Sequence, residues 1–126
     1  MIIFIEMDEN VTLADQLQKG GKDDRRSVIL RNKFNVKPYD VRGFLEACAA
    51  DAAYLKRKQG FNYAQLHRGV LDSCVFVNYA VWESVEYFNQ ATSDPAFRSA
   101  LARYPDSTAA SSHLFRKVAV RGICVN

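Results

Sequence analysis

The pattern of hydrophobic and polar residues predicts four β-strands, because successive side chains on a strand point to opposite faces. Segments 27–36 and 113–120 alternate with the two-residue period of a strand, and 61–70 and 73–83 are two further β-type runs. On the first segment one face is apolar apart from a single amide. That face consists of Val28, Leu30, Asn32, Phe34 and Val36.

Two longer segments between these strands have the spacing of amphipathic helices. The first begins at Pro38, a residue suited to a first helical turn, and we expect it to continue to a left-handed stop at Gly60. Ser84 is a suitable N-cap for the second. The pair Asp94-Pro95 predicts a break and a restart in that helix, which should end before Pro105.

The order strand, helix, strand, strand, helix, strand predicts an α+β, ferredoxin-like βαββαβ fold, with a four-stranded antiparallel sheet and both helices on one face. Gly69 and Asp72 are the expected turn residues of its central hairpin. The strand at 73–83 is apolar on both faces, which predicts a position inside the sheet. Since the face without helices is also apolar, we expect a homodimer in which a second copy covers it.

Residues 1–26 are expected to form an N-terminal arm, outside a domain that comprises residues 27–126. MIIFIEM has the composition of a short strand, and Thr12 is a suitable cap for a short helix in VTLADQLQ. Gly20-Gly21 and the charged residues after it interrupt any regular pattern. An arm that crosses to the partner subunit is one interpretation.

Composition and charge narrow the class of protein. The chain has 126 residues, of which 48% are hydrophobic and 25% charged, as expected for one globular domain. The net charge of +3 is scattered, so nucleic acid is not an expected partner. Three cysteines without a CxxC pair indicate neither a disulfide framework nor a zinc site. The apolar run MIIFI is too short for a membrane span, and we expect a cytoplasmic protein.

Asn78 is the most informative candidate residue, because it carries an amide on an apolar strand. Trp82 lies four residues further on and therefore shares its face. A buried amide costs free energy unless it is hydrogen-bonded. Asn78 therefore either has a partner within the fold or faces a ligand cavity. Asn32 joins it if the two strands are neighbours in the matching register.

The stretches VNYAVWES, LARYPD and HLFRKVAV make residues 27–121 similar to the antibiotic biosynthesis monooxygenase family. The resemblance implies a dimeric ferredoxin-like α/β barrel. It also implies oxidation of an anthrone-type or quinol-like aromatic compound by molecular oxygen, with no metal or flavin cofactor. In such enzymes the residues that match Asn78 and Trp82 line the substrate cleft.

The same resemblance assigns further residues to the cleft. Phe88 falls where those enzymes have a tyrosine, and Tyr87 stands next to it. Arg98 is a rough counterpart of a cleft arginine. From the residues themselves, His67 is the near-neutral base expected nearest to the cleft, and a surface or core-edge histidine is the other interpretation. For Trp82, Tyr87 and Phe88, packing in the core without a role in the cleft is the other interpretation.

Two other functions are weighed against the oxygenase. A haem-degrading branch of the superfamily has an asparagine that Asn32 matches. Ala91 and Leu101 stand where that branch has its tryptophan and its iron-binding histidine, which argues against haem. A dimeric ligand-binding or stress-related protein that lost the chemistry is the other alternative, and Phe88 favours it.

Overall fold

Five strands form one sheet in the order β1-β5-β2-β4-β3 in the computed structural model, which describes residues 1–22 and 24–125. The strands are β1 (Ile3–Phe4), β2 (Val28–Asn35), β3 (Phe61–Arg68), β4 (Val75–Trp82) and β5 (Ala109–Phe115). The helices are α1 (Leu13–Lys19), α2 (Val41–Leu55), α3 (Val85–Ser93) and α4 (Pro95–Leu101), and a 3-10 turn, η1 (Pro38–Asp40), leads into α2.

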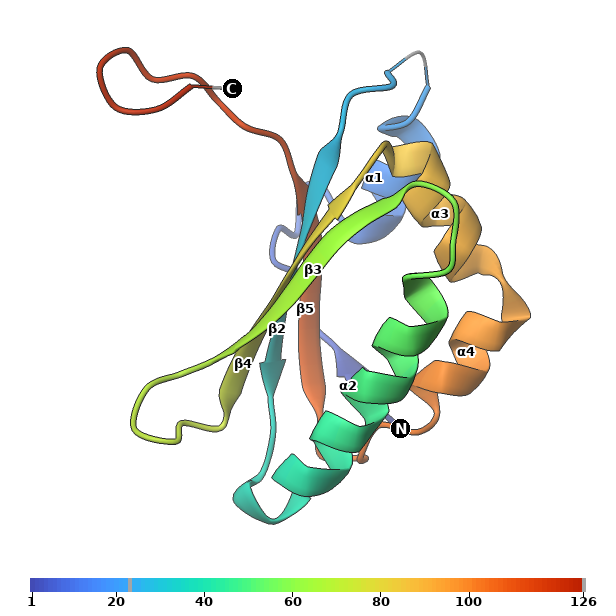
Figure 1. The fold of residues 1–126 in the computed structure, drawn as a ribbon, viewed down its shortest axis with the longest axis vertical. Helices are drawn as coiled ribbons and strands as arrows, with labels where there is room; N and C mark the ends of the chain where they lie inside the picture. Colours follow the sequence, from blue (N-terminus) through green and yellow to red (C-terminus); the bar gives the residue numbers. More distant parts are fainter. Residues whose placement is uncertain (23, 126) are drawn as a thin grey trace.

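The helices gather on one side of the sheet, and the opposite face is left uncovered (Figure 1). The α+β class, the helix–sheet layering and the interior position of β4 agree with the prediction. The four-stranded antiparallel sheet does not. A fifth strand, β1, pairs in parallel with β5 through Ile3 opposite Ala109 and Phe4 opposite Ala110, so the sheet is mixed. β1 occupies part of a sheet edge that would otherwise present unpaired backbone groups.

Side-chain caps begin α1, α3 and α4 where the sequence predicts them, whereas α2 begins without one. Thr12 Oγ1 accepts a hydrogen bond from the Asp15 N–H at 3.1 Å, and the Asp15 carboxylate accepts one from the Thr12 N–H. Ser84 caps α3, and Asp94 Oδ1 caps α4 at 2.9 Å from the Ala96 N–H. The predicted break before Pro95 is therefore confirmed, because each half-helix has its own cap.

The bounds of α2 and β5 differ from the prediction. Helix α2 ends at Leu55, and Gly60, with φ +89°, instead turns the chain into β3 against the Tyr87 ring. The last strand begins at Ala109, four residues before His113, and ends at Phe115. The small residues at 109–112 have no strand pattern, yet they pair with residues 32–35 of β2. Tertiary pairing overrides weak local preference here.

The core between sheet and helices consists of two clusters of buried side chains. One contains Ile2, Phe34, Val36, Phe44, Ala47, Phe76, Tyr104 and Ala110. The other contains Val28, Leu30, Ala80, Trp82, Val85, Phe88, Ala91 and Leu114. Along β2, β4 and β5 the two clusters are separated by one residue position on the helix-facing side. That position is polar on all three strands.

Candidate active site

A row of three polar side chains crosses the helix-facing side of the sheet. Asn32 on β2 is in register with Asn78 on β4 and with Ser112 on β5. The condition under which Asn32 joins Asn78, neighbouring strands in the matching register, is therefore met. Because each strand alternates strictly, all three side chains point to the face that carries Leu30 and Phe34.

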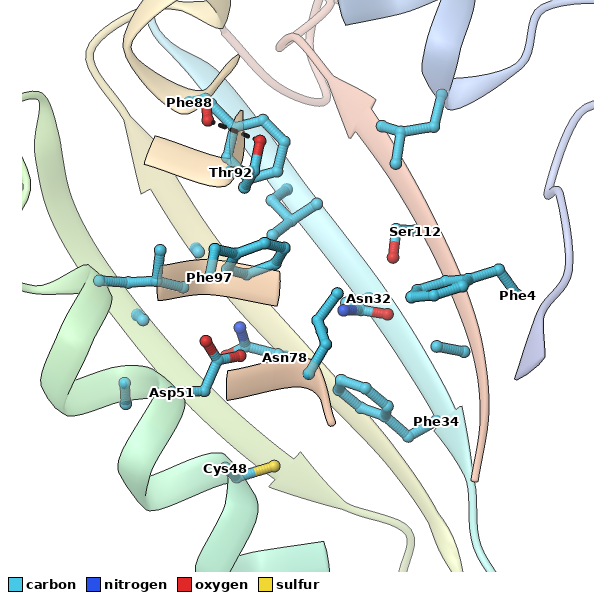
Figure 2. Close-up of a pocket in the computed structure, with 18 of the residues that line it drawn as sticks. Phe4, Asn32, Phe34, Cys48, Asp51, Asn78, Phe88, Thr92, Phe97 and Ser112 are labelled. Carbon is cyan, nitrogen blue, oxygen red and sulfur yellow. Dashed lines mark hydrogen bonds between the residues drawn. The ribbon is translucent and has the colours of Figure 1, made fainter. Parts of the chain in front are cut away.

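A cavity of about 500 Å³ lies over this row, between the sheet and the helices. Figure 2 shows Asn32, Asn78 and Ser112 on the sheet side, with Phe97 and Asp51 from helices on the other. The volume is in the range typical of small-molecule sites, and the lining is mostly apolar with a few polar groups. The space between the two core clusters is thus open.

The polar atoms of this region have unmet hydrogen-bonding capacity. Asn32 Oδ1 and Trp82 Nε1 are buried and have no hydrogen-bond partner among the described residues. Both residues line the cavity. Since buried polar groups are normally paired, an acceptor and a donor left free beside an open space indicate a site for a polar ligand atom.

Trp82 is held rigidly by aromatic neighbours. It is fully buried, and its ring makes edge contacts with Phe61 and Phe88, each with ring centroids 5.5 Å apart. Phe88 is itself 4% exposed and lines the cavity. Phe88 therefore contributes an apolar wall, in the position where the family resemblance expects a hydroxyl.

The α2 side of the cavity carries titratable groups. The Tyr104 hydroxyl donates to Asp51 Oδ2 at 3.1 Å and lies 3.7 Å from Cys48 Sγ. Burial raises the pKa of Asp51, and the hydrogen bond from Tyr104 opposes part of that rise. Burial also raises the pKa of the Cys48 thiol to about 11, and raises that of Tyr104. Both therefore keep their protons at neutral pH.

The N-terminal segment supplies another wall. Its cavity-lining residues are Ile2, Phe4, Ile5, Glu6, Leu13, Ala14 and Leu17. Gln16 fixes α1 to the sheet, because Oε1 accepts from the Leu114 N–H at 3.0 Å and Nε2 donates to the Leu114 carbonyl at 2.9 Å. Residues 1–19 thus pack on the same sheet as the rest of the chain.

Three predicted site residues do not reach the cavity. His67 is exposed and pairs with Val77, so it points to the uncovered face of the sheet. Arg98 is exposed on α4. Tyr87 lies over Gly60, and its hydroxyl accepts from Gln59 Nε2 at 3.3 Å. Side chains alternate between the two faces along a strand. Leu66, opposite Asn78, points toward the cavity, so the next residue, His67, points to the other face.

Sequence reasoning missed Asp51, Cys48, Tyr104 and Ser112 as site residues. A signal existed for Asp51, which stands seven residues after Phe44 and four before Leu55 and so falls on the apolar stripe of α2. Ser112 had no such signal, since the strand containing it was expected to begin only at His113.

Residues 1–22 and 24–125 contain neither a metal-binding cluster nor a membrane-spanning helix. No three His, Cys, Asp or Glu side chains in these ranges are grouped so that they could hold a metal ion. No helix in them has the length and apolar character needed to span a bilayer.

Comparison with known proteins places the chain in a family. Residues 27–103 match the sequence profile described as "Antibiotic biosynthesis monooxygenase". The chain belongs to the antibiotic biosynthesis monooxygenase family. The family match begins after the N-terminal segment and ends before β5. No curated protein matches the chain significantly.

Solved structures with the same fold include an oxygenase of this family type. SnoaB from Streptomyces nogalater, described as a cofactor-independent oxygenase, is 25% identical with a TM-score of 0.70, and the match covers 77% of this chain and 98% of SnoaB. A conserved protein from Methanosarcina mazei (14% identity, TM-score 0.64, 75% and 95% covered) shares the fold. Rv0793 from Mycobacterium tuberculosis also shares the fold, at 12% identity and a TM-score of 0.61, with 76% of this chain and 99% of Rv0793 covered.

Proposed function

We propose that the protein is a cofactor-independent monooxygenase that oxidises a small aromatic or quinol-like compound with molecular oxygen. The observation that carries the proposal is the cavity of about 500 Å³ lined by the in-register pair Asn32 and Asn78, with Trp82 on the same face. Family membership and the likeness to SnoaB support the same reaction class.

The proposed reaction needs no metal or organic cofactor, because the substrate anion itself supplies the electrons to oxygen. Triplet oxygen reacts slowly with closed-shell compounds, but a phenol or anthrone that has lost a proton is electron-rich enough to give oxygen one electron. The protein must therefore hold a flat ring in a dry space, stabilise the resulting oxyanion and manage protons. Fixed amide N–H groups stabilise an oxyanion, and each such donor contributes about 3–4 kcal/mol in preorganised sites.

Each residue of the cavity has a defined task in this proposal. The Asn78 and Asn32 amides bind the oxyanion of the substrate. Trp82 and Phe88 provide the aromatic surface against which the ring packs. The free Trp82 N–H gives a second polar contact for a substrate oxygen. None of these residues is a base that could take the proton from the substrate.

The experiment that tests the proposal measures oxygen uptake by the purified, metal- and flavin-free protein with anthrone or hydroquinone, with the enzyme-free rate subtracted. We expect turnover, and Asn78→Ala should reduce it at least tenfold. Asn62→Ala is the matched control, because Asn62 is exposed on β3 and does not line the cavity. An Asn78→Ala rate equal to that of the wild type would remove the site from the proposal.

A ligand-binding protein without catalysis is the competing function, and Phe88 favours it. The side chain lacks the hydroxyl that the family resemblance expects, and it is packed against Trp82 in the core. In that case the same compounds should bind the chain, seen as quenching of Trp82 fluorescence, while oxygen uptake stays at the enzyme-free rate.

We also propose a homodimer formed through the uncovered face of the sheet. This face carries Val75, Val77, Tyr79 and Val81 from β4, which are only half-buried within one chain. Tyr63 stands beside Tyr79 and is 52% exposed. An apolar strip such as β4 presents on this face is normally covered, although Arg31 and Lys33 of β2 flank it, and a two-fold dimer covers both copies at once.

A further inference from the structure

A half-buried carboxylate, Asp51, stands on the α2 wall of the cavity. In Figure 2 Asp51 projects from α2 into the space over Asn78 and Asn32. One of its oxygens, Oδ2, accepts the hydrogen bond from Tyr104. The other, Oδ1, is buried and has no hydrogen-bond partner within residues 1–22 and 24–125.

A structural role alone does not account for this arrangement. Fixing the Tyr104 hydroxyl needs one acceptor oxygen, which a neutral side chain could supply without burying a charge. Instead the chain keeps a carboxylate on the apolar stripe of α2 and leaves one oxygen free beside the cavity. Burial of an unpaired carboxylate oxygen destabilises the fold, so its retention indicates a task.

The other titratable groups around the cavity are poorer proton acceptors. Those that line it, apart from Asp51, are Glu6, Cys48 and Tyr104. Cys48 and Tyr104 hold their protons at neutral pH, because burial raises the pKa of each. Glu6 is exposed to solvent and accepts a hydrogen bond from the Leu13 N–H. Within the described ranges no histidine, lysine or arginine lines the cavity.

We propose that Asp51 is the catalytic proton acceptor, taking the acidic hydrogen of the substrate on Oδ1 while the Asn78 and Asn32 amides on the opposite wall hold the oxyanion. The assignment rests on the proposed monooxygenase function. It replaces His67, which faces the other side of the sheet. Tyr104 acts as a positioning residue, because its hydrogen bond holds Oδ2 and leaves Oδ1 as the carboxylate oxygen without a protein partner.

The proton transfers balance for a ring methylene of the anthrone type. The carboxylate takes one C–H proton, and the electron pair of that bond stays on the ring as an anion. The anion passes one electron to O₂, and the ring radical and superoxide combine to form a C–O bond. Asp51 returns its proton to the peroxide. Loss of the second hydrogen with cleavage of the O–O bond then gives a carbonyl and one water.

The test compares the pH dependence of kcat/KM for anthrone oxidation in the wild type and in Asp51→Asn. In the wild type we expect the rate to fall on the acid side, as Asp51 becomes protonated. In Asp51→Asn we expect a loss of at least about 100-fold, typical of a removed general base, and no acid limb. Asp51→Glu, which keeps a carboxylate, should restore part of the rate and its fall on the acid side of the pH profile. Circular dichroism and thermal unfolding check that each variant is folded.

Two further variants separate catalysis from structure. Tyr104→Phe removes the hydrogen bond that lowers the pKa of Asp51, so the acid limb should move to higher pH. Glu46→Gln, on the exposed side of the same helix, should keep the wild-type profile. An acid limb that persists unchanged in Asp51→Asn overturns the assignment and leaves the oxygenase standing. A wild type that fails to oxidise anthrone overturns both.

Discussion

Asn32 and Asn78 lie directly opposite each other on adjacent antiparallel strands, and both line the same cavity. Residues opposite each other on one face of a sheet have Cβ atoms about 4.5–5.5 Å apart. Two amides at that separation can bind one oxygen atom of a ligand together. The pair also lies where the two apolar clusters of the core are divided, so the site is built into the sheet rather than added at a loop.

The first prediction concerns coupling between the two amides. If both donate to one oxyanion, removing either disrupts the same interaction, and the effects of Asn32→Ala and Asn78→Ala on kcat/KM should not add. We expect each single variant to lose at least tenfold, and the double variant to lose less than the product, with a coupling energy of about 1 kcal/mol or more. Oxygen-uptake kinetics on the four proteins measure it. Strict additivity would mean that the amides bind different atoms.

The sequence placed Asn32 and Asn78 on apolar faces but left the register of their strands open, because a shift of one residue moves the whole apolar set to the other face. The same rule decides which way His67 points, and the surface position that was its other interpretation is the one observed. The strand was identified correctly, but a bulge between Phe61 and Tyr63 and the hairpin register decide which residues face inward. Local pattern alone does not determine either.

The helix side of the cavity was harder to predict than the sheet side. A helix position is buried or exposed by degrees, and the helical spacing alone does not distinguish Asp51 from its neighbour Ala52, both of which line the cavity. Tyr104 becomes a partner of Asp51 only through the packing of α4 on α2, which joins residues 53 positions apart. The role of the N-terminal segment depends likewise on pairing with the last strand.

The second prediction concerns the attachment of α1. Gln16 binds both backbone groups of Leu114, in the manner of a neighbouring strand. Gln16→Ala leaves these partly buried groups without their partner, and we expect the free energy of unfolding to fall by about 1–3 kcal/mol. Urea unfolding measures the change. Gln18→Ala, at an exposed position of the same helix, should stay within about 0.5 kcal/mol of the wild type.

The N-terminal wall should loosen in the same variant. Leu13 and Leu17 are on α1 and line the cavity, so a mobile α1 weakens substrate binding more than it slows chemistry. We therefore expect KM to rise in Gln16→Ala while kcat changes little. A variant with wild-type stability and wild-type KM would show that the contacts of Gln16 do not hold this wall in place.

The third prediction addresses the dimer. Val77 is half-buried on the uncovered face of β4, opposite His67, and a lysine there would place a charge in the proposed interface. Val77→Lys should shift the protein from dimer to monomer in sedimentation-velocity runs. Val70→Lys is the matched control, because Val70 is 87% exposed in the hairpin loop. A dimer unaffected by Val77→Lys would place the interface elsewhere.

The last prediction follows from the raised pKa of Asp51. Below about pH 3.9, the ordinary value for aspartate, the carboxyl is protonated in both the folded and the unfolded chain. As pH rises, the unfolded chain ionises first, because burial disfavours the charged form in the folded one. The wild type therefore loses stability from about pH 3.9 up to the pKa of the folded state, and no further above it.

Asparagine at this position does not ionise, so Asp51→Asn escapes that loss. The difference in Tm, variant minus wild type, should be smallest near pH 3.5, increase as pH rises, and then become constant. Calorimetric scans of both proteins between pH 3.5 and 7 measure it, and contributions of all other groups cancel in the difference. Together with a lost reaction, a gain in stability at neutral pH would show that the carboxylate is kept for its chemistry at the expense of the fold. A difference that decreases with pH would mean that the charged form of Asp51 is stabilised in the folded chain.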